Sequence, residues 1–189
     1  MSDGLANPLQ QALVTIFSET PLETLEQNVD QALEAITLQL HCDGVFVLTG
    51  SLALDHLRTR NLYLKPQFSQ GQQTRVWPLA RMPFFRSLVR TPTLLNLPDV
   101  DTLPAEAQAE RALLRDWNVK SLLVLPPVVF GETRIALGAV NCSECCEWSE
   151  EFIQEFQHAA VMIGSAMELT RIAHDMLASE HRYREVFNQ

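Results

Sequence analysis

Residues 118–140 read NVKSLLVLPPVVFGETRIALGAV, and this stretch decides the fold. Apolar and β-branched residues fill positions 121–129 and 133–140, with Gly131 between them, which predicts two strands joined by a turn. Strands joined by so short a connection pair antiparallel. Asn118 precedes the first strand, and because Asn tolerates the left-handed backbone conformation, it predicts the end of a preceding helix.

The sequence after these strands predicts one long helix. Trp148-Ser149-Glu150-Glu151 offers a capping serine followed by acids in the first turn, and Trp148 can pack on Ile153 as a hydrophobic staple. No strong helix breaker follows before Gln189, so this helix can extend about 55 Å at 1.5 Å per residue.

A three-four repeat of apolar residues runs along the far half of this helix. Such a repeat is typical of a two-stranded coiled coil, so it predicts a parallel homodimer paired through the terminal helices. The alternative is a single helix that packs on a following domain. The residues expected at the dimer seam are Leu169, Ile172, Met176 and Tyr183, with Ser179 and Val186 in the same repeat.

The sequence before residue 118 predicts further helices and strands. Leucines at helical spacing predict a short helix within residues 1–20, and Thr20-Pro21-Leu22-Glu23 predicts the capped start of a second helix that ends at Asp43-Gly44. Residues 45–48 and 56–64 then predict two strands. Loose alternation in the second strand assigns one face to Leu57, Thr59, Asn61 and Tyr63.

Four prolines divide residues 77–103, so only short elements fit there: a helix near 84–90 and a strand near 94–97. A helix from Pro104 to Trp117 completes the order. Neighbouring strand pairs with helices at both ends predict an α+β fold, in which helices cover one face of an antiparallel sheet.

Four segments share their order and spacing with one family. They are LPDVDTLP at 97–104, NVKSLLVLP at 118–126, IALGAV at 135–140 and WSEE at 148–151. Together they resemble the GAF domain, the small-molecule sensor module of signalling proteins, over roughly residues 21–170. The resemblance implies an antiparallel sheet with the N- and C-terminal helices packed on one face and a small-molecule pocket on the other. Residues 1–20 would form a helix ahead of that domain.

The tail SEHRYREVF at 179–187 resembles the opening of a PAS domain. The resemblance implies that residues 171–189 form a signalling helix that leads into a PAS-like domain. The chain would then be the N-terminal sensor of a longer bacterial receptor. The output of that receptor would be a histidine kinase or a GGDEF/EAL enzyme such as a diguanylate cyclase.

Two ligands of the family lose support from the sequence. The N-K-x-F-x-D-E signature of cyclic-nucleotide GAF domains is absent. The mid-domain Cys-His pair that anchors a bilin in phytochrome-like GAF domains is also missing, because His41-Cys42 lies too early in the chain. The resemblance therefore leaves the cofactor and the ligand unknown.

Charge is unevenly distributed along the 189 residues, whose formal net charge is −9 at pH 7. Residues 1–57 contain eight acids and no Lys or Arg, whereas residues 56–98 contain seven Lys and Arg and no acid. The acidic total argues against nucleic-acid binding. One hypothesis is that Arg75, Arg81 or Arg86 holds an anionic ligand; the alternative is that these arginines face solvent or balance the acidic N-terminal helices.

Aromatic residues gather in the same irregular region, where apolar walls with a few polar groups suit a small-molecule site. The same aromatic side chains can instead fill the core. The candidate ligand-binding residues are Trp77, Arg81, Phe85, Trp117 and Ser121.

Cys142, Cys145 and Cys146 form a cluster with C-x2-C spacing, which suits a metal or a redox pair. Three reduced thiols in a strand-to-helix loop is the simpler interpretation. Some GAF domains are thiol-dependent methionine-sulfoxide reductases, so the resemblance makes that enzyme an alternative. His158 is a candidate axial haem ligand or a surface histidine.

The sequence as a whole predicts a ligand-sensing regulatory domain that is not an enzyme. No basic-apolar leader opens the chain, and no apolar run approaches the ~20 residues of a membrane helix, so we expect a cytoplasmic protein without a membrane segment. The expected partners are a small molecule and a second copy of the chain. A dimerisation spacer, with a pocket closed by its own aromatic residues, is a third interpretation.

Overall fold

The computed structural model describes residues 7–18, 25–51, 56–69, 76–90, 93–126, 128–130 and 133–187. At its centre lies one antiparallel sheet. Its strands are β1 (Gly44–Ser51), β2 (His56–Leu64), β3 (Val76–Pro78), β4 (Leu95–Leu97), β5 (Ser121–Val124), β6 (Val128–Phe130) and β7 (Thr133–Asn141). They lie in the order β3-β2-β1-β7-β5-β4, and β6 also pairs with β7.

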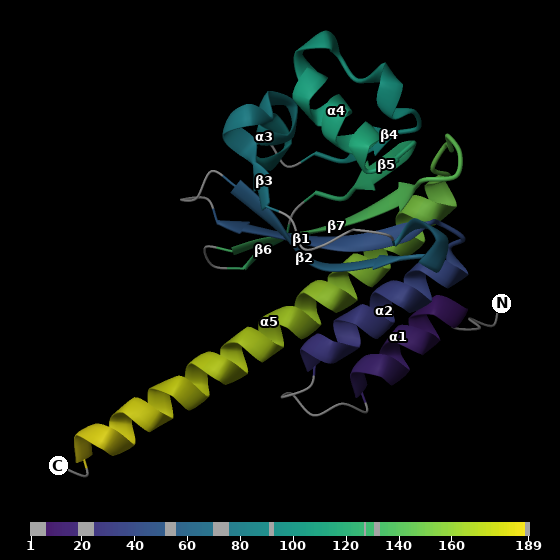
Figure 1. Ribbon diagram of the computed structural model, residues 1–189. Coiled ribbons are helices and arrows are strands. Elements are labelled where there is room, and N and C mark those ends of the chain that lie inside the picture. Colours follow the sequence, from purple (N-terminus) through teal and green to yellow (C-terminus); the bar gives the residue numbers. More distant parts are fainter. Residues whose placement is uncertain are drawn as a thin grey trace.

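Helices lie on both faces of the sheet (Figure 1). One face is covered by α1 (Pro8–Ser18), α2 (Leu25–Gln39) and the first part of the long α5 (Glu150–Phe187). The other face is covered by α3 (Pro83–Arg90) and α4 (Gln108–Asp116). The predicted α+β fold is thereby confirmed. None of the described helices combines the length and the apolarity that a membrane span requires.

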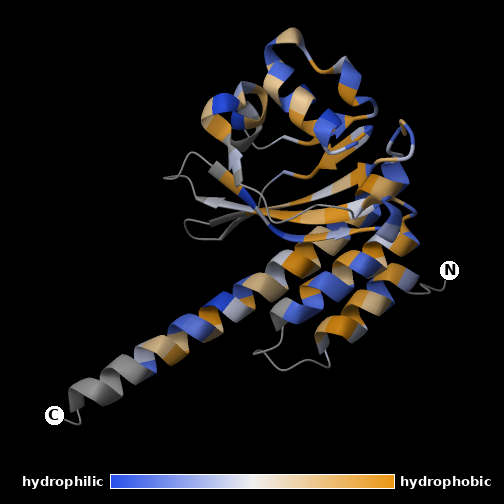
Figure 2. Ribbon diagram, in the orientation of Figure 1, coloured by the Kyte–Doolittle hydropathy of each residue, from blue (hydrophilic) through white to orange (hydrophobic). Residues whose placement is uncertain are grey.

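The sheet separates two apolar cores, because successive residues of a strand point to opposite faces. Figure 2 shows how strongly apolar residues concentrate on the strands. The helix-side core includes Leu13, Val29, Leu33, Ile36, Val45, Val47, Leu123, Phe156 and Ile163. The pocket-side core includes Phe46, Leu48, Leu57, Trp77, Phe85, Leu114, Leu122 and Val140.

Strand β2 occupies the predicted residues, but a β-bulge reverses its alternation. Val47 pairs with Asn61, and the next residue, Leu48, pairs with Thr59, so Arg60 is the extra residue. The predicted single alternation is therefore wrong beyond Arg60. The side chains that reach the pocket side are Leu57, Thr59, Leu62 and Leu64.

The bulge also turns two polar side chains of β2 towards α2. The Asn61 amide donates to the Asp30 carboxylate at 2.9 Å, and the Tyr63 hydroxyl donates to the Glu34 carboxylate at 3.1 Å. Desolvation, together with the hydrogen bond to Glu34, raises the pKa of Tyr63. These contacts fasten the acidic helix α2 to the sheet.

The strand predicted over residues 121–129 is two strands. Strand β5 ends at Val124 and β6 begins at Val128. The sequence between them contains Pro126 and Pro127, and proline cannot donate to a strand ladder. Both strands pair with β7, so the predicted antiparallel arrangement is confirmed although the single strand is wrong.

The helix predicted from Pro104 begins later, at Gln108. A 3₁₀ turn over Ala105–Ala107 precedes it, closed by the Ala107 amide donating to the Pro104 carbonyl at 3.0 Å. The predicted cap of α5 is confirmed, since the Phe152 amide donates to the Ser149 hydroxyl at 3.1 Å. The predicted helix start at 20–23 and the turn at Gly131 lie outside the described residues.

Candidate functional site

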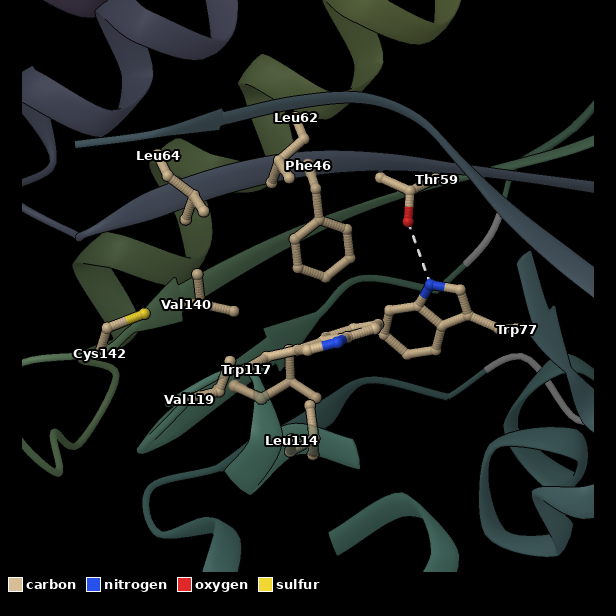
Figure 3. Close-up of a pocket in the computed structure, with 11 residues that line it drawn as sticks. Phe46, Thr59, Leu62, Leu64, Trp77, Leu114, Trp117, Val119, Val140 and Cys142 are labelled. Carbon is tan, nitrogen blue, oxygen red and sulfur yellow. Dashed lines mark hydrogen bonds between the residues drawn. The ribbon is translucent and has the colours of Figure 1, made fainter. Parts of the chain in front are cut away.

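A small cavity lies between the sheet and the C-terminal end of α4 (Figure 3). Its volume is about 30 Å³, which leaves room for about two water molecules. Pockets that hold drug-sized ligands measure ~300–1,000 Å³. A ligand can therefore enter only if part of the wall moves. The lining residues are Phe46, Thr59, Leu62, Leu64, Trp77, Leu114, Trp117, Val119, Leu122, Val140 and Cys142.

Two tryptophans close the cavity on the side away from the sheet. The ring centroid of Trp77 lies 5.0 Å from that of Trp117 in an edge-to-face arrangement, and 5.4 Å from that of Phe85. The Trp77 indole N–H donates to the Thr59 hydroxyl at 3.0 Å, as Figure 3 shows. This bond links Trp77 to β2 across the end of the cavity.

A glycine of β7 shapes the sheet side of the cavity. Gly138 pairs with Phe46 in the β1–β7 ladder, and a Cβ added at Gly138 would overlap the Phe46 ring. The missing side chain therefore lets the ring lie against the sheet. Phe46 then forms part of the cavity wall.

The end of α4 places three lining residues together. The Val119 amide donates to the Leu114 carbonyl at 2.8 Å and the Asn118 amide donates to the Arg115 carbonyl at 2.9 Å, which is the Schellman pattern. Asn118 adopts the left-handed conformation that this pattern needs, with φ of 56°, as its position in the sequence predicts. The turn aims Leu114, Trp117 and Val119 at the cavity.

A buried carboxylate joins α3 to α4. Glu110 of α4 is fully buried, and its Oε1 accepts the Phe84 amide at 2.9 Å. This bond satisfies one of the amides that the first turn of α3 leaves without a helical partner. Because Phe85 follows directly and packs against Trp77 with its ring tilted, Glu110 also supports a lining residue of the cavity.

The start of β1 holds the end of β7 through Asp43. Its Oδ2 accepts the amides of Cys142 and Ser143 at 2.9 Å each and the Ser143 hydroxyl at 2.6 Å, and its Oδ1 accepts Lys65 Nζ at 3.1 Å. Burial alone would raise the pKa of Asp43, but the hydrogen bonds from Ser143, Cys142 and Lys65 together hold the pKa below its ordinary value. The carboxylate therefore stays ionised and fastens this turn.

Ser121 makes a second fastening in the same loop. Its hydroxyl donates to the Pro98 carbonyl at 2.7 Å and accepts the Cys146 amide at 2.7 Å. Ser121 therefore lies outside the cavity lining and joins β5 to the segment before α5. Residues 142–149 begin at the cavity, with Cys142, and end where α5 begins.

The structure brings together two of the candidate ligand-binding residues, Trp77 and Trp117. Phe85 is buried behind Trp77 without lining the cavity, and Arg81 is exposed. Arg86 is half-buried and does not line the cavity, and Arg75 lies outside the described residues. Among the described residues, no charged side chain lines the cavity, so its geometry gives the anionic-ligand hypothesis no support.

The cysteine cluster does not act as one group. Cys142 lines the cavity, whereas Cys145 is exposed. Burial, followed by the charge of Asp43, raises the pKa of Cys142 to about 11. Partial loss of solvent contact is the first cause that raises the pKa of Cys145 and Cys146, followed at Cys145 by the charge of Asp99. Within the described ranges, no three His, Cys, Asp or Glu side chains gather in a way that suits a metal ion.

The histidine considered for haem lies away from the cavity. His158 is exposed on α5, on the opposite face of the sheet, and its Nδ1 lies 3.4 Å from Nε2 of Gln10. The interpretation as a surface histidine fits this position.

Sequence reasoning misses the lining residues that the sheet contributes. Residues 45–48 are all apolar, so the sequence does not show whether residues 45 and 47 or residues 46 and 48 face the cavity. The signal that could have decided it is Gly138, since an unfilled position on one strand makes room for a large ring on its neighbour. That signal needs the β1–β7 pairing, which local sequence does not supply.

The comparison with solved structures agrees with this architecture, whereas no curated protein matches the chain. Among solved structures, the phycoerythrobilin-bound GAF domain from a cyanobacterial phytochrome is 15% identical, with a TM-score of 0.69 over 90% of this chain and 100% of that chain. The blue-light absorbing form of the Thermosynechococcus elongatus PixJ GAF domain is 20% identical, with a TM-score of 0.61 over 94% and 98% of the two chains.

A structure from a chemotaxis protein is also similar. Residues 122 to 287 of a methyl-accepting chemotaxis protein are 16% identical, with a TM-score of 0.65 over 85% of this chain and 98% of that chain. At these identities the likeness shows the fold. The sequence itself matches the GAF domain family over residues 24–167, so the chain belongs to the GAF domain family.

Proposed function

We propose that this GAF domain senses a small molecule in the cavity and signals through α5 as part of a bacterial receptor. The observation that carries the proposal is the direct connection between the two: residues 142–149 run from the cavity lining to the first turn of α5, fastened by Asp43 and Ser121. A chemotaxis protein and light-absorbing receptors among the similar structures support a sensory role.

The proposed transmission starts at the wall that can yield. The strands that line the cavity are hydrogen-bonded to neighbours, whereas Trp117 lies at the end of the nine-residue α4. A ligand would displace Trp117 and Val119, and Val119 is two residues from Ser121. The Ser121 hydroxyl would then shift Cys146 and, with it, the start of α5.

We further propose that α5 signals as a parallel homodimer. Leu169, Ile172 and Met176, in the second half of α5, are 56%, 41% and 69% exposed. Apolar side chains at this three-four spacing gain stability when a second helix covers them. Tyr183 continues the repeat, although its side chain lies outside the described set.

We also propose the domain division that the sequence predicts, and with it a place in a cytoplasmic histidine kinase or GGDEF/EAL receptor. Residues 1–20 would form the leading helix, residues 21–170 the GAF domain and residues 171–189 the signalling helix into a PAS-like domain. The family match over residues 24–167 fits the central part of this division.

A bilin does not fit this chain. A tetrapyrrole needs far more space than about 30 Å³. The described lining contains one cysteine, Cys142, and no histidine, whereas a bilin-anchoring Cys-His pair would need both. Cys42 is buried in the helix-side core, on the opposite face of the sheet. We therefore derive no photochemical function.

The methionine-sulfoxide reductase alternative is weaker. Such a reaction needs a thiolate, and the pKa of each of the four thiols is raised, to about 12 at Cys42 and about 11 at Cys142.

The dimerisation-spacer alternative differs from a sensor in one property, since a spacer's cavity would never take a ligand.

Native mass spectrometry of freshly purified protein tests the sensor and the dimer together. We expect a dimer, and a small molecule bound to it. Met176→Glu should give a monomer, whereas the control Leu94→Glu, at an exposed residue ahead of β4, should leave the dimer intact. A monomer at high concentration would contradict the dimer, and a ligand-free protein that no added small molecule stabilises would favour the spacer.

A further inference from the structure

We propose that the cavity takes a small, uncharged and mainly apolar ligand, about the size of one aromatic ring, and rejects anions and cations. This inference rests on the proposed function and names the ligand class of the same site.

The walls of the cavity are the first observation. Nine of the eleven lining residues have aliphatic or aromatic side chains, and the other two are Thr59 and Cys142. An ion placed among such side chains loses its water without gaining a partner of opposite charge, which costs several kcal/mol. The walls therefore favour a neutral molecule over an ion of the same shape.

The absence of charged side chains from the described lining is the second observation. Lys65 is paired with Asp43 at 3.1 Å, and neither residue lines the cavity. Of the two described candidates for anion binding, Arg81 is exposed and Arg86 is half-buried, and both lie outside the lining. An anion inside the cavity would therefore meet no cationic side chain among the described lining residues.

The two polar side chains of the lining limit what the ligand can offer. The Thr59 hydroxyl accepts the Trp77 indole N–H, so its own hydrogen can be donated to a ligand oxygen. Cys142 carries a thiol, a weak donor, at the other end of the cavity (Figure 3). One hydroxyl or carbonyl on an apolar body would therefore be matched, and additional polar groups would be buried without partners.

The size of the ligand follows from which wall can move. A cavity of about 30 Å³ is too small for a ring, since a cavity of ~150 Å³ holds benzene in another protein. The Trp117 ring stands at the end of α4, where the chain turns through Asn118, and its displacement would release the space of one aromatic ring. A larger ligand would also have to separate paired strands.

Three molecules of nearly equal size and different charge test the inference: benzyl alcohol, benzoate and benzylamine. Each is added to the purified full chain while the Tm and the tryptophan fluorescence are measured. We expect benzyl alcohol at ten times its Kd to raise the Tm by about 3–6 °C. Benzoate and benzylamine at the same concentration should leave the Tm unchanged.

Two variants show whether binding occurs in the cavity. Val140→Ile adds one methylene group to the lining and should abolish the response to benzyl alcohol. Trp117→Phe enlarges the cavity and should strengthen that response. Circular dichroism confirms that each variant is folded, and Val140→Ile is the decisive variant if Trp117→Phe fails to fold.

The other outcomes separate this inference from the proposed function. Benzoate binding that Val140→Ile abolishes would overturn the ligand class and leave the sensing cavity in place. Benzyl alcohol binding that persists unchanged in Val140→Ile would overturn the cavity as the site. If no probe binds to the parent or to folded Trp117→Phe, both the ligand class and the proposed sensor fail.

Discussion

The two faces of the sheet are covered in different ways. On the helix side, the helices contain 11, 15 and 38 residues, and their side chains Leu13, Leu33 and Phe156 are fully buried. On the pocket side, helices of 8 and 9 residues and short turns cover the sheet, and the cavity lies beneath them. Helices as short as α3 and α4 are marginal by themselves, so the cover of the pocket side depends on its tertiary contacts.

This difference assigns the two faces separate tasks. The helix-side core holds α5 on the sheet and fixes its direction. On the pocket side, single polar contacts such as Glu110 to the Phe84 amide join the short helices above the apolar core, and we expect these helices to open locally more readily than the helix side. A sensor needs both properties, because a change on one face must be carried by a rigid element on the other.

The largest expected effect is on the helix side. Phe156→Ala should lower the free energy of unfolding by about 3–5 kcal/mol, because Phe156 is fully buried among helices that cannot collapse around the space. Phe85→Ala is the matched change on the pocket side and should cost less, since short segments can close around it. Urea unfolding measures both variants, and an equal or larger loss for Phe85→Ala would contradict the comparison.

Asp43→Asn should have the next largest effect, about 1.5–3 kcal/mol, because it replaces an ionised acceptor of four hydrogen bonds. The pKa of Asp43 is lowered in the folded chain, so its contribution is complete above the unfolded pKa of about 3.9 and is lost as the pH falls through the folded value. Urea titrations from pH 7 to pH 2 should show a less steep acid decline in the variant. An identical decline would exclude this role for Asp43.

Gly138→Ala should destabilise the chain by about 1–3 kcal/mol, because the new Cβ overlaps the Phe46 ring. The double variant Gly138→Ala with Phe46→Leu should recover part of the loss, since the smaller side chain leaves room. Thermal unfolding of the two variants and of Phe46→Leu alone measures the coupling. Additive effects would mean that the glycine has another role.

The smallest expected effect is at the end of α4. Asn118→Ala should lower the free energy of unfolding by about 1–2 kcal/mol, because the left-handed conformation at φ of 56° is unfavourable for alanine. Asn118→Gly should stay within about 0.5 kcal/mol of the parent, since glycine adopts that conformation freely. The two chevron or equilibrium curves should therefore separate, and coincident curves would contradict the Schellman assignment.

Much of the fold can be predicted from sequence because its signals are local. The loose alternation of 56–64 indicates β2, although a bulge interrupts it. The serine at 149 indicates the start of α5, and Asn118 indicates the end of α4. The bulge at Arg60 cannot be read this way, because it depends on how β2 is paired with β1. Pro126 and Pro127 indicate the break between β5 and β6, because two prolines interrupt a strand even when the residues around them are apolar.

The candidate site is less predictable than the fold. Trp77 and Trp117 stand out as large aromatic residues in an irregular segment, and both line the cavity. Ser121 instead turns its hydroxyl towards Pro98 and Cys146, because the loops on both sides converge there. Which face a strand residue joins depends on strand order, and strand order is a property of the whole chain.

Amide hydrogen exchange, with and without benzyl alcohol, tests the central claim most directly, because it reads both faces in one experiment. In the free protein, amides of α3 and α4 should exchange faster than those of α2 and β1. Ligand should slow exchange in residues 108–119 and 142–152 and leave α2 unchanged. Equal protection of the two faces in the free protein, or a ligand effect spread evenly over α2 and α4, would contradict the division into a rigid face and a responsive one.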